Sequence, residues 1–319
     1  MEPDKGRRGP TIADRGDSGG NVDSAVQVRG LTKRYGSQLA VDDVTFDVPV
    51  GRVVGFLGPN GAGKSTTMRM IVGLTAPTSG TATIFGTPFH DLADPARTVG
   101  SIVDGVGSHP GRRAIDELRI SAAAAGIPRA RCAEVLELVG LQDVGDKRVG
   151  QFSLGMRQRL GLAQALLGDP QVLLLDEPAN GLDPEGIHWV RELLRTLADD
   201  GRAVFVSSHL LAEISRLADE VMVIRRGQLV ARAAVDELTR AADGGLLVAS
   251  RDDAALGDAL RTAGAQVEPY GAGLRVAGLD AAEVGEAALG AGVALTLLQP
   301  HATELEDIFM ELTAGGGIG

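Results

Sequence analysis

A glycine-rich segment carrying one lysine and one serine is the first feature of this sequence that could do chemistry. Residues 58–65 read Gly-Pro-Asn-Gly-Ala-Gly-Lys-Ser and fit the pattern G-x-x-x-x-G-K-[ST]. Glycines let backbone N–H groups converge on phosphate oxygens, and Lys64 supplies a cation to the β- and γ-phosphates. The Ser65 hydroxyl can bind Mg²⁺. The segment therefore predicts a site for ATP and Mg²⁺.

The residues on either side of this segment are those that a phosphate-binding loop needs. Residues 53–57 form a continuous apolar run, and a helical pattern with Met68, Ile71 and Leu74 follows. A helix that begins at the loop adds positive potential for an anion, so a chance glycine-rich turn is the weaker interpretation. The predicted phosphate-binding residues are Gly58, Pro59, Asn60, Gly61, Ala62, Gly63, Lys64, Ser65 and Thr66.

Two adjacent acids end a second apolar run, in residues 171–178 (QVLLLDEP). Asp176, at the end of the expected strand, is placed to hold Mg²⁺ through water. Glu177 is placed to orient or deprotonate an attacking water. Alone, the pair could equally be a solvated turn, but the glycine-rich segment in the same chain favours a catalytic site.

Four further segments resemble the ATP-binding cassette (ABC) ATPases. Residues 152–160 (FSLGMRQRL) resemble the family's signature motif, and residues 179–183 (ANGLD) look like its D-loop. His209, in residues 207–209 (SSH), matches the switch histidine, and Tyr35 stands where the family stacks an aromatic ring on adenine. With the glycine-rich segment and the acids, these motifs follow the family's order from residue 35 to residue 209.

The resemblance implies a site shared between two chains. In the family, the helix start that carries Ser153 and Gly155 faces the γ-phosphate bound to the other protomer, Asp183 couples the two sites, and His209 holds the γ-phosphate. Because the chain has one set of motifs, a homodimer or a pair with a similar cassette is implied. Taken singly, Ser153 could be an ordinary helix cap, and Tyr35 or His209 a structural residue.

The sequence departs from the family pattern in two places. The signature reads FSLGM where LSGGQ is commoner, so Leu154 replaces a glycine and Met156 a glutamine. Asp104 stands where the family usually has a glutamine that touches the Mg²⁺ and water site and links to the membrane partner. An acid there could still reach the metal or water, so Asp104 is a third candidate metal ligand; the alternative is a surface-loop residue. These features are similar to those of bacterial daunorubicin-resistance-type exporter subunits, in which residues 105–113 would form part of the groove for the permease.

The pattern of apolar residues predicts an α/β fold. Val44, Phe46 and Val48 alternate like a half-exposed strand, whereas residues 53–57, 172–175 and 203–206 are continuous runs typical of buried parallel strands. Mostly helical sequence from about residue 112 to 165 interrupts this rhythm. We therefore expect a P-loop NTPase of the ABC type, with a RecA-like core, an antiparallel β lobe and a helical insertion.

We predict three parts along the chain: a flexible tail over residues 1–24, the ATP-binding domain over 25–241 and a small domain over 242–319. In the last part, Asp252 and Gly257 recur as Asp280 and Gly285, 28 positions later, in a βαββαβ order similar to a ferredoxin-like α+β module. A final amphipathic helix is expected from Thr303. We expect this module to serve dimerisation or regulation.

Composition limits the class of protein further. At 319 residues the chain is long enough for two domains, and its formal net charge of −11 argues against a nucleic-acid partner. The single Cys132 fits a reducing cytosol, and no stretch is apolar enough to span a membrane. We expect a cytoplasmic ATPase, peripheral on the inner face of the membrane, that energises a separate multi-span permease for export of a drug, antibiotic or other hydrophobic compound. The alternatives are an ATPase acting on ribosomes or DNA and a nucleotide-dependent regulator.

Overall fold

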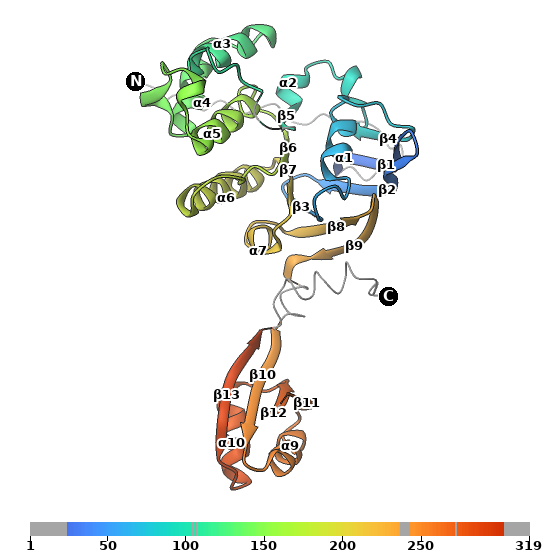
Figure 1. Ribbon diagram of the computed structural model, residues 1–319, viewed down its shortest axis with the longest axis vertical. Helices are drawn as coiled ribbons and strands as arrows, with labels where there is room; N and C mark the ends of the chain where they lie inside the picture. The colour runs from blue at the N-terminus through green and yellow to red at the C-terminus, as the bar shows by residue number, and fades with distance from the viewer. Residues whose placement is uncertain (1–23, 104, 106, 237–242, 272, 303–319) are drawn as a thin grey trace, which may run out of the picture.

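The computed structural model describes residues 24–103, 105, 107–236, 243–271 and 273–302 (Figure 1). Its strands are β1 (Ser24–Tyr35), β2 (Gln38–Pro49), β3 (Val53–Leu57), β4 (Ser79–Ile84), β5 (Val99–Ile102), β6 (Val172–Asp176), β7 (Ala203–Ser208), β8 (Glu220–Arg225), β9 (Gln228–Ala234), β10 (Asp243–Ser250), β11 (Gln266–Tyr270), β12 (Gly273–Ala277) and β13 (Leu295–Ala302). Its α-helices are α1 (Lys64–Ile71), α2 (Pro95–Thr98), α3 (Ala114–Ala124), α4 (Arg131–Leu138), α5 (Leu154–Ala165), α6 (Pro184–Asp199), α7 (Leu211–Ile214), α9 (Asp253–Thr262) and α10 (Ala281–Gly290). None of the helices in these ranges is both long enough and apolar enough to cross a bilayer.

A six-stranded sheet in the order β5-β6-β7-β3-β8-β9 forms the core of the larger part. Strands β5, β6, β7, β3 and β8 are parallel to one another, and the edge strand β9 is antiparallel to β8. Every residue of β3 and β7 is buried, as expected for parallel strands covered on both faces. The three runs predicted as buried parallel strands thus lie side by side at the centre of the sheet.

A second, three-stranded antiparallel sheet has the order β2-β1-β4. The ring centroid of Phe46 on β2 lies 5.8 Å from that of Phe56 on β3 and 5.3 Å from that of Phe205 on β7, so aromatic packing joins the two sheets. Strand β1 begins at Ser24, the last residue of the segment predicted as a tail, and Ser24 pairs with Pro49 on β2. Residues 1–23 lie outside the described ranges.

Helices α3, α4 and α5 occupy the stretch predicted as a helical insertion. Leu118, Val135 and Leu160, one from each helix, are fully buried in a shared apolar core. On α5, the guanidinium carbon of Arg159 lies 4.6 Å from the ring centroid of Trp189 on α6, a cation–π contact. These helices are therefore attached to the core through α5 and α6. The limits of the predicted domains stay predictions.

Cys132 lies on α4 with no exposed surface. Burial raises the pKa of its thiol, so the unreactive protonated form is favoured at neutral pH. We expect a maleimide to label the native protein at least about 100-fold more slowly than the protein unfolded in guanidinium. Because the chain has one cysteine, mass spectrometry of the intact protein measures this site alone. Rapid labelling of the native protein would contradict the burial of α4.

The segment from β10 to β13 forms a small sheet of its own in the order β11-β12-β10-β13, with each pair of neighbours antiparallel. The element order β10-α9-β11-β12-α10-β13 is the βαββαβ order expected from sequence. The repeated aspartates have the same task, since Asp252 caps the N-terminus of α9 and Asp280 that of α10. The final helix predicted from Thr303 lies outside the described residues.

Candidate active site

The glycine-rich loop joins the buried strand β3 to helix α1, and two of its glycines are required by their surroundings. A Cβ atom on Gly58 would lie 2.3 Å from the carbonyl oxygen of Ile224. Gly63 has a φ of 116°, and a Cβ atom there would lie 2.7 Å from the carbonyl oxygen of Ala40. The close approach of the backbone therefore explains the glycines, and the loop ends at the positive N-terminus of α1, which begins at Lys64.

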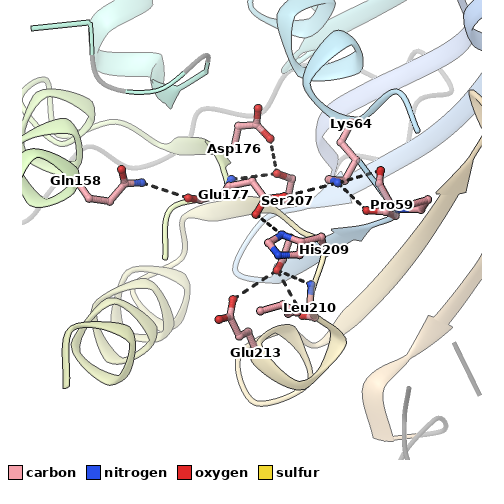
Figure 2. A network of polar contacts seen from close by, with 11 residues as sticks. Pro59, Lys64, Gln158, Asp176, Glu177, Ser207, His209, Leu210 and Glu213 are labelled. Carbon is pink, nitrogen blue, oxygen red and sulfur yellow. Dashed lines mark hydrogen bonds and ion pairs between the residues drawn. The ribbon is translucent and has the colours of Figure 1, made fainter. Parts of the chain in front are cut away.

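Lys64 is held in place by the loop itself. Its side chain is only 6% exposed, and its Nζ donates hydrogen bonds to the carbonyl oxygens of Gly58 and Pro59 at 2.6 and 3.4 Å. The same Nζ lies 3.6 Å from the Glu177 Oε1 (Figure 2). A buried ammonium that already faces the loop and a carboxylate is in a position to receive phosphate oxygens.

The two acids lie at the carboxyl end of β6, next to β7. Ser207 on β7 donates a short hydrogen bond to Asp176 and accepts one, 3.0 Å long, from the backbone N–H of Glu177. Glu177 has a φ of 51°, a left-handed conformation that is uncommon for a residue other than glycine. Its carboxylate is thereby directed toward Lys64 on one side and His209 on the other (Figure 2).

His209 follows β7 directly. Its Nδ1 lies 2.7 Å from the Glu177 Oε2, and 41% of its side chain is exposed. The turn after it is closed by Ser208, whose Oγ accepts a hydrogen bond from the N–H of Leu210 at 3.0 Å. Lys64, Glu177 and His209 therefore meet although they come from three separate segments of the chain.

A cavity of about 400 Å³ opens at this meeting point. Its size falls within the range of small-molecule sites, and Tyr35 at the end of β1 lies at its rim with its side chain 46% exposed. The Nζ of Lys33 lies 5.0 Å from the Tyr35 ring centroid. The cavity is lined by Tyr35, Gln38, Ala40, Asn60, Gly61, Gly63, Lys64, Ser65, Thr66, Glu177, Asn180 and His209. Gly58, Pro59 and Ala62 belong to the loop but do not line the cavity.

The remaining predicted residues, Ser153, Gly155 and Asp183, line a different cavity of about 520 Å³. Ser153 caps α5 by accepting a hydrogen bond from the N–H of Met156 at 3.1 Å, and Asp183 caps α6 from Gly186 at 2.8 Å. Both side chains thus have a structural task as helix caps. Within one chain, these three residues therefore line a common cavity that does not contain the phosphate-binding loop.

Leu154, which replaces a glycine of the commoner signature motif, lies against Gly181 in the segment 179–183. A Cβ atom on Gly181 would lie 2.1 Å from the Cδ2 of Leu154. Leu154 therefore packs where a side chain at position 181 would lie, so the departure from the commoner motif is accommodated within the same chain.

The two described residues predicted to hold Mg²⁺ carry the oxygen donors that this ion prefers, although Asp176 does not line the cavity that contains Ser65. Mg²⁺ prefers oxygen ligands and is commonly held by one or two protein groups together with substrate phosphates. Ser65 and Asp176 supply a hydroxyl and a carboxylate of this kind. Within the part of the chain that the structure describes, no group of three or more His, Cys, Asp or Glu side chains could hold a metal by itself. Asp104, the third predicted metal ligand, lies outside the described residues.

Two residues at the site were not assigned a role from sequence. Ser207 bridges Asp176 and Glu177, and Gln158 on α5 donates a hydrogen bond from its Nε2 to the carbonyl oxygen of Glu177 at 3.2 Å. The sequence did contain a pattern that points to Gln158. Its spacing places it on the same face of a helix as Leu162 and Ala165, and in the structure all three side chains are buried. A polar residue at a buried position of an apolar face needs a partner.

A loop of backbone amides after a buried parallel strand, a lysine at the start of the next helix and two acids at the carboxyl end of another strand of the same sheet together define a phosphate-loop ATPase. Comparisons with known proteins identify the family of phosphate-loop ATPases to which the chain belongs. The ABC transporter family matches residues 41–180, and a domain of unknown function matches residues 244–306.

The chain is 46% identical to a bacitracin transport ATP-binding protein of Bacillus licheniformis over 222 residues, 69% of this chain and 72% of that protein. It is 36% identical to Nod factor export ATP-binding protein I of Burkholderia orbicola over 295 residues, 90% of this chain and 96% of that protein. A solved structure of the ATP-binding subunit of an ABC transporter matches with a TM-score of 0.62 and 30% identity, covering 68% of this chain and 93% of the other.

The chain belongs to the ATP-binding proteins of ABC transporters, and its activity is ATP hydrolysis coupled to transport. The predicted fold class and the predicted ATPase function are confirmed.

Proposed function

We propose that two copies of this chain bind two ATP molecules between them and energise a separate permease that exports an antibiotic or another hydrophobic compound. The observation that carries the proposal is the cavity in which Tyr35, the glycine-rich loop, Glu177 and His209 come together. In this proposal Tyr35 stacks on adenine, and Lys64 and the loop amides bind the phosphates.

The hydrolytic step would depend on Glu177 and His209. Glu177 would orient or deprotonate the attacking water, and His209, at 2.7 Å from that carboxylate, would hold the γ-phosphate. Ser65 and Asp176 would hold Mg²⁺, which when bound supplies positive charge at the β- and γ-phosphates. Lys64 contributes a fixed positive charge beside the same carboxylate.

The separate cavity lined by Ser153, Gly155 and Asp183 supports a dimer. These residues have no place in the cavity around Lys64, and the exposed start of α5 offers backbone N–H groups to a phosphate from another chain. When the γ-phosphate is lost, the shared ligand of the two chains is lost, and the dimer loosens. The permease would then change state.

The transported compound is proposed from the relatives. The similarity to a bacitracin transport protein and the near full-length similarity to a Nod factor export protein support export of an antibiotic or another hydrophobic compound. The chain would lie at the inner face of the membrane through its permease, with residues 105–113 in the groove that receives it. The small module of β10 to β13 is proposed to serve dimerisation or regulation.

The test is to tag the Glu177→Gln protein in its own host, extract it with detergent in ATP and Mg²⁺, and identify by mass spectrometry what co-purifies. We expect a multi-span membrane protein in an amount matching the ATPase. Ribosomal or DNA-bound proteins in its place would favour the rival function, an ATPase acting on ribosomes or DNA.

A further inference from the structure

Glu177 holds its carboxylate between Lys64 and His209 by means of an unfavourable backbone conformation. Its φ of 51° lies in the left-handed region, where the Cβ atom of a residue other than glycine is crowded. Such a conformation persists only where the surroundings fix it, and it is concentrated at functional sites. The groups that fix the Glu177 backbone therefore decide where its carboxylate lies.

Three hydrogen bonds hold the two peptide groups of Glu177. Its N–H donates to the Ser207 Oγ at 3.0 Å. Its carbonyl oxygen accepts a hydrogen bond from the backbone N–H of Asn180 at 3.1 Å. The same oxygen accepts a second hydrogen bond from the Gln158 Nε2 at 3.2 Å (Figure 2). Ser207 belongs to β7 and Asn180 to the turn that follows Glu177. Gln158 comes from α5, so it connects a different part of the fold to this backbone.

Gln158 is well placed to carry a change of position from α5 to the site. It is 8% exposed, and a buried amide is costly to leave without a partner. Ser153 caps helix α5, and Gln158 lies within about one and a half turns of both residues proposed to face the partner's phosphate, Ser153 and Gly155. A shift of α5 that changes the place of Ser153 and Gly155 must therefore move the donor on the Glu177 carbonyl or break that hydrogen bond.

We propose that Gln158 is a positioning residue that makes the alignment of the Glu177 carboxylate depend on the orientation of α5. Through this hydrogen bond, Gln158 connects the start of α5, which is proposed to meet the second copy of the chain, to the Glu177 carboxylate, which is proposed to act on water. This inference rests on the proposed role of Glu177 in hydrolysis. A misplacement of about 1 Å in a catalytic group can lower a rate about 100-fold, so one hydrogen bond to its backbone is enough to matter.

The first test replaces Gln158 by methionine, which keeps most of the buried volume and removes the N–H donor. We expect kcat for ATP hydrolysis to fall about tenfold, with KM and the Kd for a fluorescent ATP analogue within about twofold of the wild type. The matched control is Gln164→Met on the same helix, whose amide donates to the Ser108 Oγ at 3.3 Å, remote from Glu177. The control is expected to keep its kcat within about twofold. A wild-type kcat for Gln158→Met would overturn the inference.

The second test is a double-mutant cycle, which separates positioning from a general structural effect. The residual single-turnover rate of Glu177→Gln is compared with that of Glu177→Gln combined with Gln158→Met. If Gln158 acts through the carboxylate, the second substitution changes the residual rate by less than about twofold, because the group that it positions is already gone. A further tenfold loss in the double variant would overturn the inference. Full turnover by Glu177→Gln alone would instead refute the proposed function.

Discussion

Glu177→Gln is expected to lower steady-state ATP hydrolysis by at least about 100-fold while ATP binding is retained. In the wild type the His209 Nδ1 lies 2.7 Å from the Glu177 Oε2. The glutamine amide has nearly the size of the carboxylate and can keep this contact, but it cannot accept a proton from water. Phosphate release measures the hydrolysis, and a fluorescent ATP analogue measures the binding. Because ATP persists in this variant, light scattering after gel filtration is expected to show a dimer in ATP and a monomer without it.

The matched control for this substitution is Glu192→Gln. Glu192 lies on the exposed side of α6, where its Oε1 is 3.6 Å from the His188 Nε2, and it does not line the cavity around Lys64. Its replacement changes the net charge by the same amount and is expected to leave hydrolysis within about twofold. Equal activity in Glu177→Gln and Glu192→Gln would show that the catalytic carboxylate has been assigned wrongly.

Lys64→Met is expected to weaken ATP binding by about 100-fold or more and to abolish measurable hydrolysis. The Nζ of Lys64 lies 3.6 Å from the Glu177 Oε1, and the lysine side chain is shielded from water, so its attraction for phosphate is weakly screened. Methionine retains a similar stem without the charge. Isothermal titration with ATP and Mg²⁺ measures the loss, and a thermal unfolding curve of each variant shows that the fold is retained.

Lys147→Met provides the comparison for this second prediction. Lys147 is exposed in the segment between α4 and α5 and lies outside both cavities described above. Its replacement removes one positive charge from the chain, as Lys64→Met does, and is expected to change the Kd for ATP by less than about twofold. An equal loss in both variants would mean that net charge, and not the phosphate-binding loop, controls the affinity.

The central sheet and the phosphate-binding loop could be predicted from sequence because their signals are local. Residues 53–57 and 203–206 are continuous apolar runs, and such runs are typical of strands buried on both faces. The loop carries its own pattern, and the steric reason for it appears only in the structure, where Gly58 faces the Ile224 carbonyl. The 28-residue repeat was visible for the same reason, and the structure shows that its aspartates, Asp252 and Asp280, each cap a helix.

The contacts around the acids could not be predicted, because they join residues far apart in the chain. Ser207 meets Asp176 and Glu177 across two neighbouring strands, and Gln158 reaches Glu177 from a helix. The left-handed φ of Glu177 also has no local signal, since that conformation is imposed by tertiary contacts. Sequence patterns identify the reactive groups at this site. The residues that hold those groups in position can be identified only from the structure.

The cation–π contact between Arg159 and Trp189 has a practical consequence for following this protein in solution. Trp189 is the chain's only tryptophan, and it lies at the seam between α5 and α6. Indole emission depends on the charge and the water around the ring, and here a guanidinium on the neighbouring helix lies against that ring. The unlabelled protein therefore carries an optical reporter at the junction between the helical segment and the core, and tryptophan fluorescence can follow the two parts through a catalytic cycle in real time.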